Sequence, residues 1–111
     1  MFRWINRHSE YLEFRQAHQI IRTTFFTVLV IYAQDSAFAY GTTVSHRVGN
    51  AVNRNLIRRR IKAWFRQNTF ELQAGMKINL IAKGSISKIS WEQLSTELSE
   101  IISNLKKLSN P

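Results

Sequence analysis

The sequence predicts an α+β fold, a single domain over residues 1–111 in which a small mixed sheet of about four strands packs with three helices. The length of 111 residues suits one domain of the usual ~100 to 200 residues. β-Branched and aromatic residues are concentrated at 25–32, and an apolar period of 3.6 residues is present at 52–68 and at 91–108. The expected order is therefore helix, two antiparallel strands, helix, strand, helix, with the fourth strand not placed.

The N-terminal third is predicted to be a helix followed by a hairpin. Residues 9–21 are expected to be helical, with Ser9 as the cap and two glutamates in the first turns, where the helix dipole favours anions. The run 25–32 predicts a buried strand. A turn at 35–36 and a second strand at 38–46 would complete the hairpin.

The remaining residues contain the two clearest helical patterns. Gly49 and Asn50 end the second strand, and a helix is expected to follow up to Asn68. Its apolar face consists of Ile57, Ile61, Trp64 and Phe65. A strand at 77–83 follows, and it is expected to run parallel to the strand that precedes the long helix.

Ser90 and Gln93 form a capping-box pattern that opens the last helix. Its apolar stripe consists of Trp91, Leu94, Leu98, Ile101, Ile102, Leu105 and Leu108. We expect this stripe to pack against the sheet. The alternative, a coiled coil, has too few heptads in its favour.

The charge balance indicates a polyanionic partner. Sixteen lysine and arginine residues against seven acidic residues give a net charge of +9. No acidic residue lies between Asp35 and Glu71, whereas that interval holds seven basic residues. Beside the apolar face of the helix the wheel places a basic ridge, which consists of Arg58, Arg59, Lys62 and Arg66, with Asn55 on the same arc and Arg54 at the helix entry. Like charges four residues apart repel, so this ridge predicts a nucleic acid that relieves the repulsion, in preference to an anionic membrane surface.

Composition excludes several other classes of protein. The chain has no cysteine, so it has neither disulfides nor thiolate zinc sites, and a cytoplasmic location is expected. The apolar run 25–33 is far shorter than the ~20 residues of a membrane-spanning helix. Protein-catalysed phosphodiester hydrolysis uses clustered carboxylates or a histidine pair. The three histidines lack such spacing, and we expect no catalytic or metal-binding residue.

Residues 44–62 read Val-Ser-His-Arg-Val-Gly-Asn-Ala-Val-Asn-Arg-Asn-Leu-Ile-Arg-Arg-Arg-Ile-Lys. This segment resembles the signature of the bacterial ribonuclease P protein component, Val-Ser-Lys-Lys-x-Gly-x-Ala-Val-x-Arg-Asn-Arg-x-Lys-Arg-x-x-Arg. The resemblance implies an accessory subunit of a ribonucleoprotein endoribonuclease, in which a catalytic RNA removes the 5′ leader from precursor tRNA. It implies ribonuclease P RNA and precursor tRNA as partners, with no membrane and no DNA. It also implies no cofactor bound by the protein alone, Mg²⁺ for the holoenzyme, and a left-handed crossover.

The resemblance also implies two RNA-binding surfaces. The catalytic RNA would contact Ser45, His46, Arg47, Gly49, Asn50, Arg54, Asn55, Arg58, Arg59, Lys62 and Arg66. The single-stranded leader would occupy a cleft between the sheet and the first helix, at Tyr11, Phe14 and Phe26. For Tyr11 and Phe14, packing of the first helix on the sheet is the alternative.

The chain departs from the family pattern at several positions: His46 and Arg47 replace its paired lysines, and His18 replaces a common glycine. Leu56 stands where the family usually repeats arginine, and Arg15 stands where a second cleft aromatic is common. A structural RNA-binding protein such as a ribosomal protein fits the charge equally well, and the signature at 44–62 is what separates it from a ribonuclease P subunit. A DNA-binding regulator would need a helix that reads bases, whereas this ridge carries side chains that contact phosphate.

Overall fold

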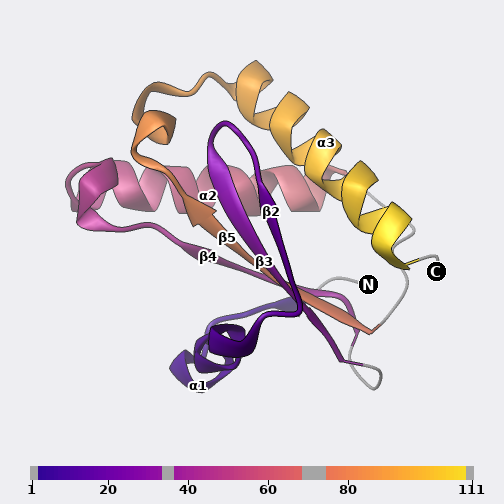
Figure 1. Cartoon of the computed structure of the whole chain (residues 1–111). Helices are drawn as coiled ribbons and strands as arrows, with labels where there is room; N and C mark the ends of the chain where they lie inside the picture. Colours follow the sequence, from indigo (N-terminus) through magenta and orange to yellow (C-terminus); the bar gives the residue numbers. More distant parts are fainter. Residues whose placement is uncertain (1–2, 34–36, 69–74, 110–111) are drawn as a thin grey trace.

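The computed structural model describes residues 3–33, 37–68 and 75–109, which form a five-stranded mixed sheet covered by helices (Figure 1). In chain order the elements are β1 (Arg3–Trp4), α1 (His8–Leu12), η1 (a 3₁₀ turn, Glu13–Gln16), β2 (Gln19–Arg22), β3 (Phe26–Tyr32), β4 (Ala39–Thr43), η2 (His46–Val48), α2 (Ala51–Gln67), β5 (Met76–Ala82), η3 (Gly84–Lys88) and α3 (Trp91–Ser109). The α+β prediction is confirmed, with five strands in place of about four.

The strand order is β1-β4-β5-β3-β2. The expected hairpin between the strands at 25–32 and 38–46, which are β3 and β4, is therefore wrong. β5 lies between β3 and β4, antiparallel to β3 and parallel to β4. The β3–β5 ladder runs from the Phe26–Ala82 pair to the Tyr32–Met76 pair. Pairing with this distant strand, which is buried on both faces, replaced the local pairing that a turn at 35–36 predicts. That turn lies outside the described residues.

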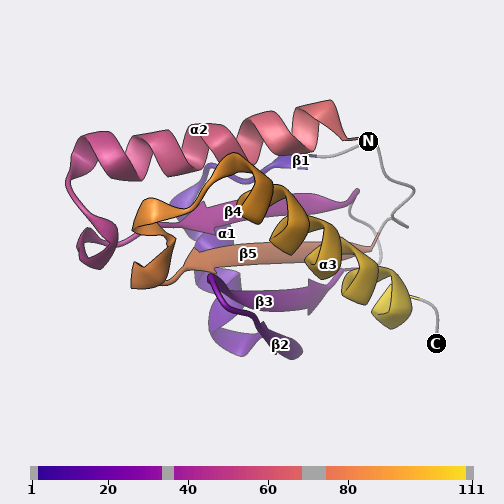
Figure 2. The ribbon, with the colours of Figure 1, turned by 90° about the horizontal axis from the view of Figure 1, so that it is seen from above.

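The parallel relation of β4 and β5 is confirmed, and α2 is the crossover between them. In Figure 2, which looks onto α2 and α3, both strands point to the left and β5 lies below β4. The β4–α2–β5 connection is therefore left-handed, as the family resemblance implies. Such connections are right-handed in about 98% of proteins.

The predicted helix at 9–21 is wrong in length and in its cap. α1 spans five residues, and η1 continues it only to Gln16. Arg7 occupies the N-cap position without a side-chain hydrogen bond, so Ser9 is not the cap. Ala17 is extended (φ −59°, ψ 136°), and β2 then pairs antiparallel with β3. Pairing along the edge of the sheet outweighed the helical pattern of this segment.

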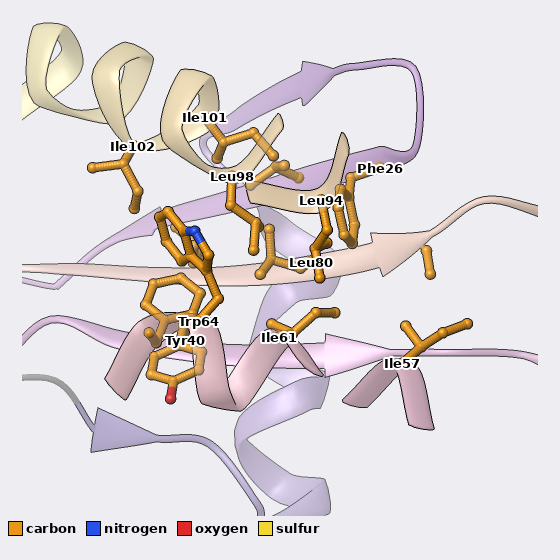
Figure 3. Packing of buried hydrophobic residues seen from close by; sticks show 14 of the residues in the cluster. Phe26, Tyr40, Ile57, Ile61, Trp64, Leu80, Leu94, Leu98, Ile101 and Ile102 are labelled. Atoms are coloured by element: carbon orange, nitrogen blue, oxygen red, sulfur yellow. The ribbon is translucent and has the colours of Figure 1, made fainter. Parts of the chain in front are cut away.

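α2 and α3 cover one face of the sheet (Figure 3). The predicted apolar face of α2 is buried, and Trp64 donates through Nε1 to Ser95 Oγ of α3 at 3.0 Å. Leu94, Leu98 and Leu105 of α3 are at most 1% exposed, which confirms packing on the sheet. The Ser90–Gln93 capping box is also confirmed, because each residue's backbone N–H donates to the other's side chain.

α1 and η1 cover part of the opposite face (Figure 1). A second, smaller core lies there, in which Phe14 packs with Ile5, Ile31 and Ala39. No helix of the described residues covers the remainder of this face (Figure 1).

Candidate nucleic-acid interface

The turn before α2 is built by two residues with separate roles. Gly49 has φ 153°, and a Cβ there would lie 3.0 Å from Asn53 Nδ2, so this position favours glycine. Asn50 is the N-cap of α2, and its Oδ1 accepts the Asn53 backbone N–H at 3.0 Å. The Gly49-Asn50 pair thus sets where the basic helix begins. It does not end the preceding strand as expected, because β4 ends at Thr43 and η2 lies between them.

Arg54 joins this turn to the helix. Its Nη1 donates to the carbonyl oxygen of Gly49 at 3.2 Å and lies 3.2 Å from His46 Nδ1. Ser45, His46 and Arg47 are all exposed in or beside η2. The structure therefore brings the predicted turn residues together with the entry to the basic ridge.

Along α2 the ridge residues are held in different ways. Arg58 donates to Asn55 Oδ1 at 3.0 Å and to the carbonyl oxygen of Val44 at 3.4 Å, so its guanidinium is oriented before any ligand arrives. Arg59 and Arg66 are exposed. Arg60 lies off the ridge and donates to the carbonyl oxygen of Ile89 at 3.3 Å.

A hollow of about 600 Å³ lies beside the ridge, lined by Trp4, Val52, Asn55, Arg58, Arg59 and Lys62. Lys62 Nζ lies 4.8 Å from the Trp4 ring centroid, a cation–π distance, and Trp4 packs edge-on against Tyr40 at 5.0 Å. Val52 is 71% exposed. Sequence reasoning missed Trp4 and Val52, although a tryptophan among the N-terminal basic residues was a usable signal.

Carboxylates are paired elsewhere in the molecule. In the described chain the ion pairs are Arg3–Glu10 at 2.7 Å, Lys77–Glu10 at 3.2 Å and Lys77–Glu13 at 3.0 Å, all on the α1 side of the sheet. Among the described residues no carboxylate pairs with the ridge, so no described carboxylate relieves the repulsion between its cations. The ridge is suited to a polyanion.

The structure brings together two of the three predicted leader residues, Tyr11 and Phe14, and separates Phe26 from them. Phe14 and Tyr11 lie in the smaller core, where Phe14 is 3% exposed. Phe26 is fully buried in the main core, on the face of the sheet that α2 and α3 cover, so its assignment to the leader cleft is corrected. Strand alternation places Phe26 opposite to that cleft, which the spacing of aromatics along the sequence does not reveal.

The register identifies which residues occupy the uncovered part of the α1 face, hereafter the open sheet face. They are Ile20, Arg22, Thr27, Leu29, Thr43 and Ile81. Ile20 is 48% exposed and lies opposite Leu29, while Arg22 is exposed and lies opposite Thr27. This surface combines apolar side chains with a cation, and sequence analysis missed it because β2 was expected to be helical.

The described residues hold neither a cluster of metal ligands nor a membrane-spanning helix. Residues 3–33, 37–68 and 75–109 contain no group of three or more histidine or acidic side chains placed to hold a metal ion. Within the same ranges no helix is long and apolar enough to span a membrane.

The fold is thus an α+β mixed sheet whose crossover helix α2 carries clustered arginines suited to a polyanion. The family model for ribonuclease P matches residues 3–106. The ribonuclease P protein components of Citrifermentans bemidjiense and Geotalea uraniireducens are 37% and 34% identical, each over 91% of this chain and over 86% and 88% of their own lengths. The chain therefore belongs to the ribonuclease P protein family.

Solved structures support the same fold. The RNase P protein of Staphylococcus aureus superposes with a TM-score of 0.80 at 23% identity, covering 93% of this chain and 94% of that one. The RNase P protein of Thermotoga maritima gives a TM-score of 0.76 at 22% identity, covering 95% and 96%.

Proposed function

We propose that this chain is the protein subunit of a ribonuclease P ribonucleoprotein in the cytoplasm, where it binds the ribonuclease P RNA and the 5′ leader of precursor tRNA. One observation carries the proposal. The segment that resembles the family signature forms the exposed turn and ridge at α2, whose cations lack carboxylate partners in the described chain. The family match over residues 3–106 favours this function over that of a ribosomal protein.

The ridge supplies the surface for the partner RNA. Arginine binds phosphate with a planar fork, and the Asn55 and Val44 oxygens already orient Arg58. Each cation that contacts a phosphate releases counterions, so binding is salt-dependent. The contacts are of the phosphate type, which suits an RNA recognised through its shape.

The open sheet face supplies the surface for the leader. Ile20 and Leu29 present apolar side chains suited to unstacked bases, and Arg22 lies beside them for the backbone. Tyr11 and Phe14 pack α1 and η1 against the sheet in the smaller core, which supports a structural role for them in preference to base stacking.

Catalysis is assigned to the RNA, with Mg²⁺ held by RNA phosphates. The exposed surface of α2 offers guanidinium, ammonium and amide groups, which bind phosphate but provide neither a carboxylate pair nor a general acid–base pair. The described residues of the chain contain no cluster of side chains suited to hold Mg²⁺.

Reconstitution tests the proposal. Precursor tRNA is incubated with protein alone, with ribonuclease P RNA from the same genome alone, and with both, over a range of Mg²⁺ concentrations. We expect no cleavage by RNA-free protein and faster leader removal by the mixture than by the RNA alone. Cleavage by rigorously RNA-free protein, or no gain from adding protein, would overturn the proposal.

A further inference from the structure

A second pocket lies between α2 and α3, on the side of α2 away from the Trp4 hollow. Its volume is about 460 Å³, and it is lined by Leu56, Arg59, Arg60, Ala63, Gln67 and Trp91. Pockets that hold small ring systems have volumes of about 300 to 1,000 Å³. The lining combines an apolar floor with two guanidinium groups and contains no carboxylate.

Trp91 is the unusual member of this pocket. It begins the apolar stripe of α3, yet it is 39% exposed, whereas Leu94 and Leu98 are 1% and 0% exposed. The stripe predicted a buried tryptophan. The structure instead leaves part of the indole open beside Leu56, the position where the family usually has arginine.

The walls of the pocket are fixed by hydrogen bonds. The Ser90–Gln93 capping box sets the first turn of α3, which carries Trp91. Arg60 donates to the carbonyl oxygen of Ile89, and Trp64 donates to Ser95 Oγ across the two helices. The site is thus formed in the free protein, and a ligand pays little ordering entropy to enter it.

Arg59 connects the pocket to the ridge, because it lines both this pocket and the Trp4 hollow. A phosphate bound at Arg59 would place the adjoining nucleotide within reach of the indole. Bases stack on aromatic side chains irrespective of sequence, and arginine neutralises the phosphate.

We propose that the Leu56–Trp91 pocket binds one unstacked base of single-stranded RNA, with the base on the Trp91 indole and the neighbouring phosphate on Arg59. The inference rests on the proposed function in that RNA lies along α2, but it adds a base-binding site that the phosphate contacts of the ridge do not require.

The first test uses a ten-nucleotide single-stranded RNA that contains 5-iodouridine. Replacing Trp91 by leucine keeps an apolar side chain and removes the aromatic face. We expect W91L to bind this RNA about 5- to 150-fold more weakly, the equivalent of about 1 to 3 kcal/mol at 1.4 kcal/mol per tenfold. W91F should recover most of the loss, and irradiation should crosslink the wild-type protein at Trp91. Thermal melting checks that each variant is folded.

The matched control is Tyr32→Leu. Tyr32 is an aromatic residue of similar exposure, 41%, and it lines neither of the two pockets beside α2. We expect Y32L to bind the oligonucleotide as the wild type does. Equal binding by folded W91L and wild type, no binding by either, or a crosslink at Trp4 in place of Trp91 would overturn the proposal.

A second arm repeats the comparison with ribonuclease P RNA. Failure of the wild-type protein to bind that RNA overturns the proposed function. The oligonucleotide experiment then still tests whether the Leu56–Trp91 pocket binds a base. A pocket that binds an apolar protein segment and no RNA would be recognised by W91L retaining full affinity in both arms.

Discussion

The hydroxyl oxygen of Tyr11 lies where β4 has no room for a side chain, because a Cβ at Gly41 would stand 2.6 Å from it. That hydroxyl donates to the carbonyl oxygen of Ile5 at 3.1 Å and accepts the Thr42 backbone N–H at 3.0 Å. β1 ends at Trp4, and the tyrosine hydroxyl accepts the N–H that β4 exposes beyond that point. Burial raises the pKa of Tyr11, so the phenol keeps its proton at neutral pH.

We expect Gly41→Ala to displace α1 from the sheet. Overpacking of this kind costs about 1 to 3 kcal/mol of unfolding free energy, and it should weaken binding of leader-bearing precursor tRNA more than binding of ribonuclease P RNA. Urea unfolding and the two binding assays measure these effects. Gly84→Ala is the control, since a Cβ there meets only the Arg47 carbonyl oxygen at 3.8 Å. A G41A variant as stable as the wild type would show that Tyr11 is not held at this position.

Phe14 is predicted to stabilise the protein through packing. At 3% exposure, Phe14→Ala should cost about 3 to 5 kcal/mol of unfolding free energy and weaken all RNA ligands alike through unfolding. Leu12→Ala, at a neighbouring residue that is 40% exposed, should change stability by only about 0.5 kcal/mol. If folded F14A lost affinity for the leader-bearing precursor alone, base stacking by Phe14 would be the correct interpretation.

The ion pairs of α1 predict a stability loss in acid. The Arg3 guanidinium, aided by Lys77, lowers the pKa of Glu10 from 4.5 to about 2. A lowered carboxyl pKa contributes stability that is fully present above pH 4.5 and is lost as the pH falls from there towards 2. The pH dependence of unfolding should therefore be shallower in this window for Glu10→Gln. Glu92→Gln, an exposed change on α3, serves as the control, and identical curves for wild type and E10Q would contradict the assignment.

Glu97 is expected to hold the β2–β3 turn against α3. It is 7% exposed, and its Oε2 accepts the Phe25 N–H at 2.5 Å and the Thr23 hydroxyl at 2.9 Å. Glu97→Ala removes the acceptor of the Phe25 N–H and leaves the Thr23 hydroxyl with the Phe26 carbonyl oxygen alone, so it should cost about 1 to 3 kcal/mol of unfolding free energy. Amide hydrogen exchange should increase first at this turn. The exposed Glu100→Ala is the comparison, and equal exchange in both variants would count against the role.

The elements that sequence analysis predicted well are those whose pattern is local. α2 was predicted to within a residue because its apolar period, the Gly49 break and the Asn50 cap agree with one another. The strand at 38–46 ended early at Thr43, since the chain then enters η2. After β5 the chain forms a 3₁₀ turn, η3, before α3 begins.

The errors arose where distant segments meet. Residues 19–22 form a strand, β2, because they pair with the edge of β3. β3 does not pair with β4 because β5, which follows α2 in the chain, lies between them. Periodicity along the chain contains no information on such insertions. The handedness of the crossover came from the family resemblance alone.

The candidate site likewise contains residues that a local pattern predicts and residues that only the packing of distant elements brings into place. The ridge follows from the helix wheel, so its residues were predicted individually. Trp4, the open sheet face and the exposure of Trp91 depend on how β1, β2 and α3 pack, and Phe26 was misassigned because its face of the sheet is set by the register with β5.

The salt dependence of binding to ribonuclease P RNA tests the central claim, that the α2 ridge is the RNA interface. Arg59→Gln with Arg66→Gln removes two exposed ridge charges, and Lys88→Gln with Lys107→Gln removes two exposed charges from η3 and α3. Both double variants change the net charge equally. The account predicts that the slope of log K against log salt falls by about 0.7 to 0.9 per lost contact in the ridge variant and is unchanged in the other. Equal slopes in the two variants would contradict it.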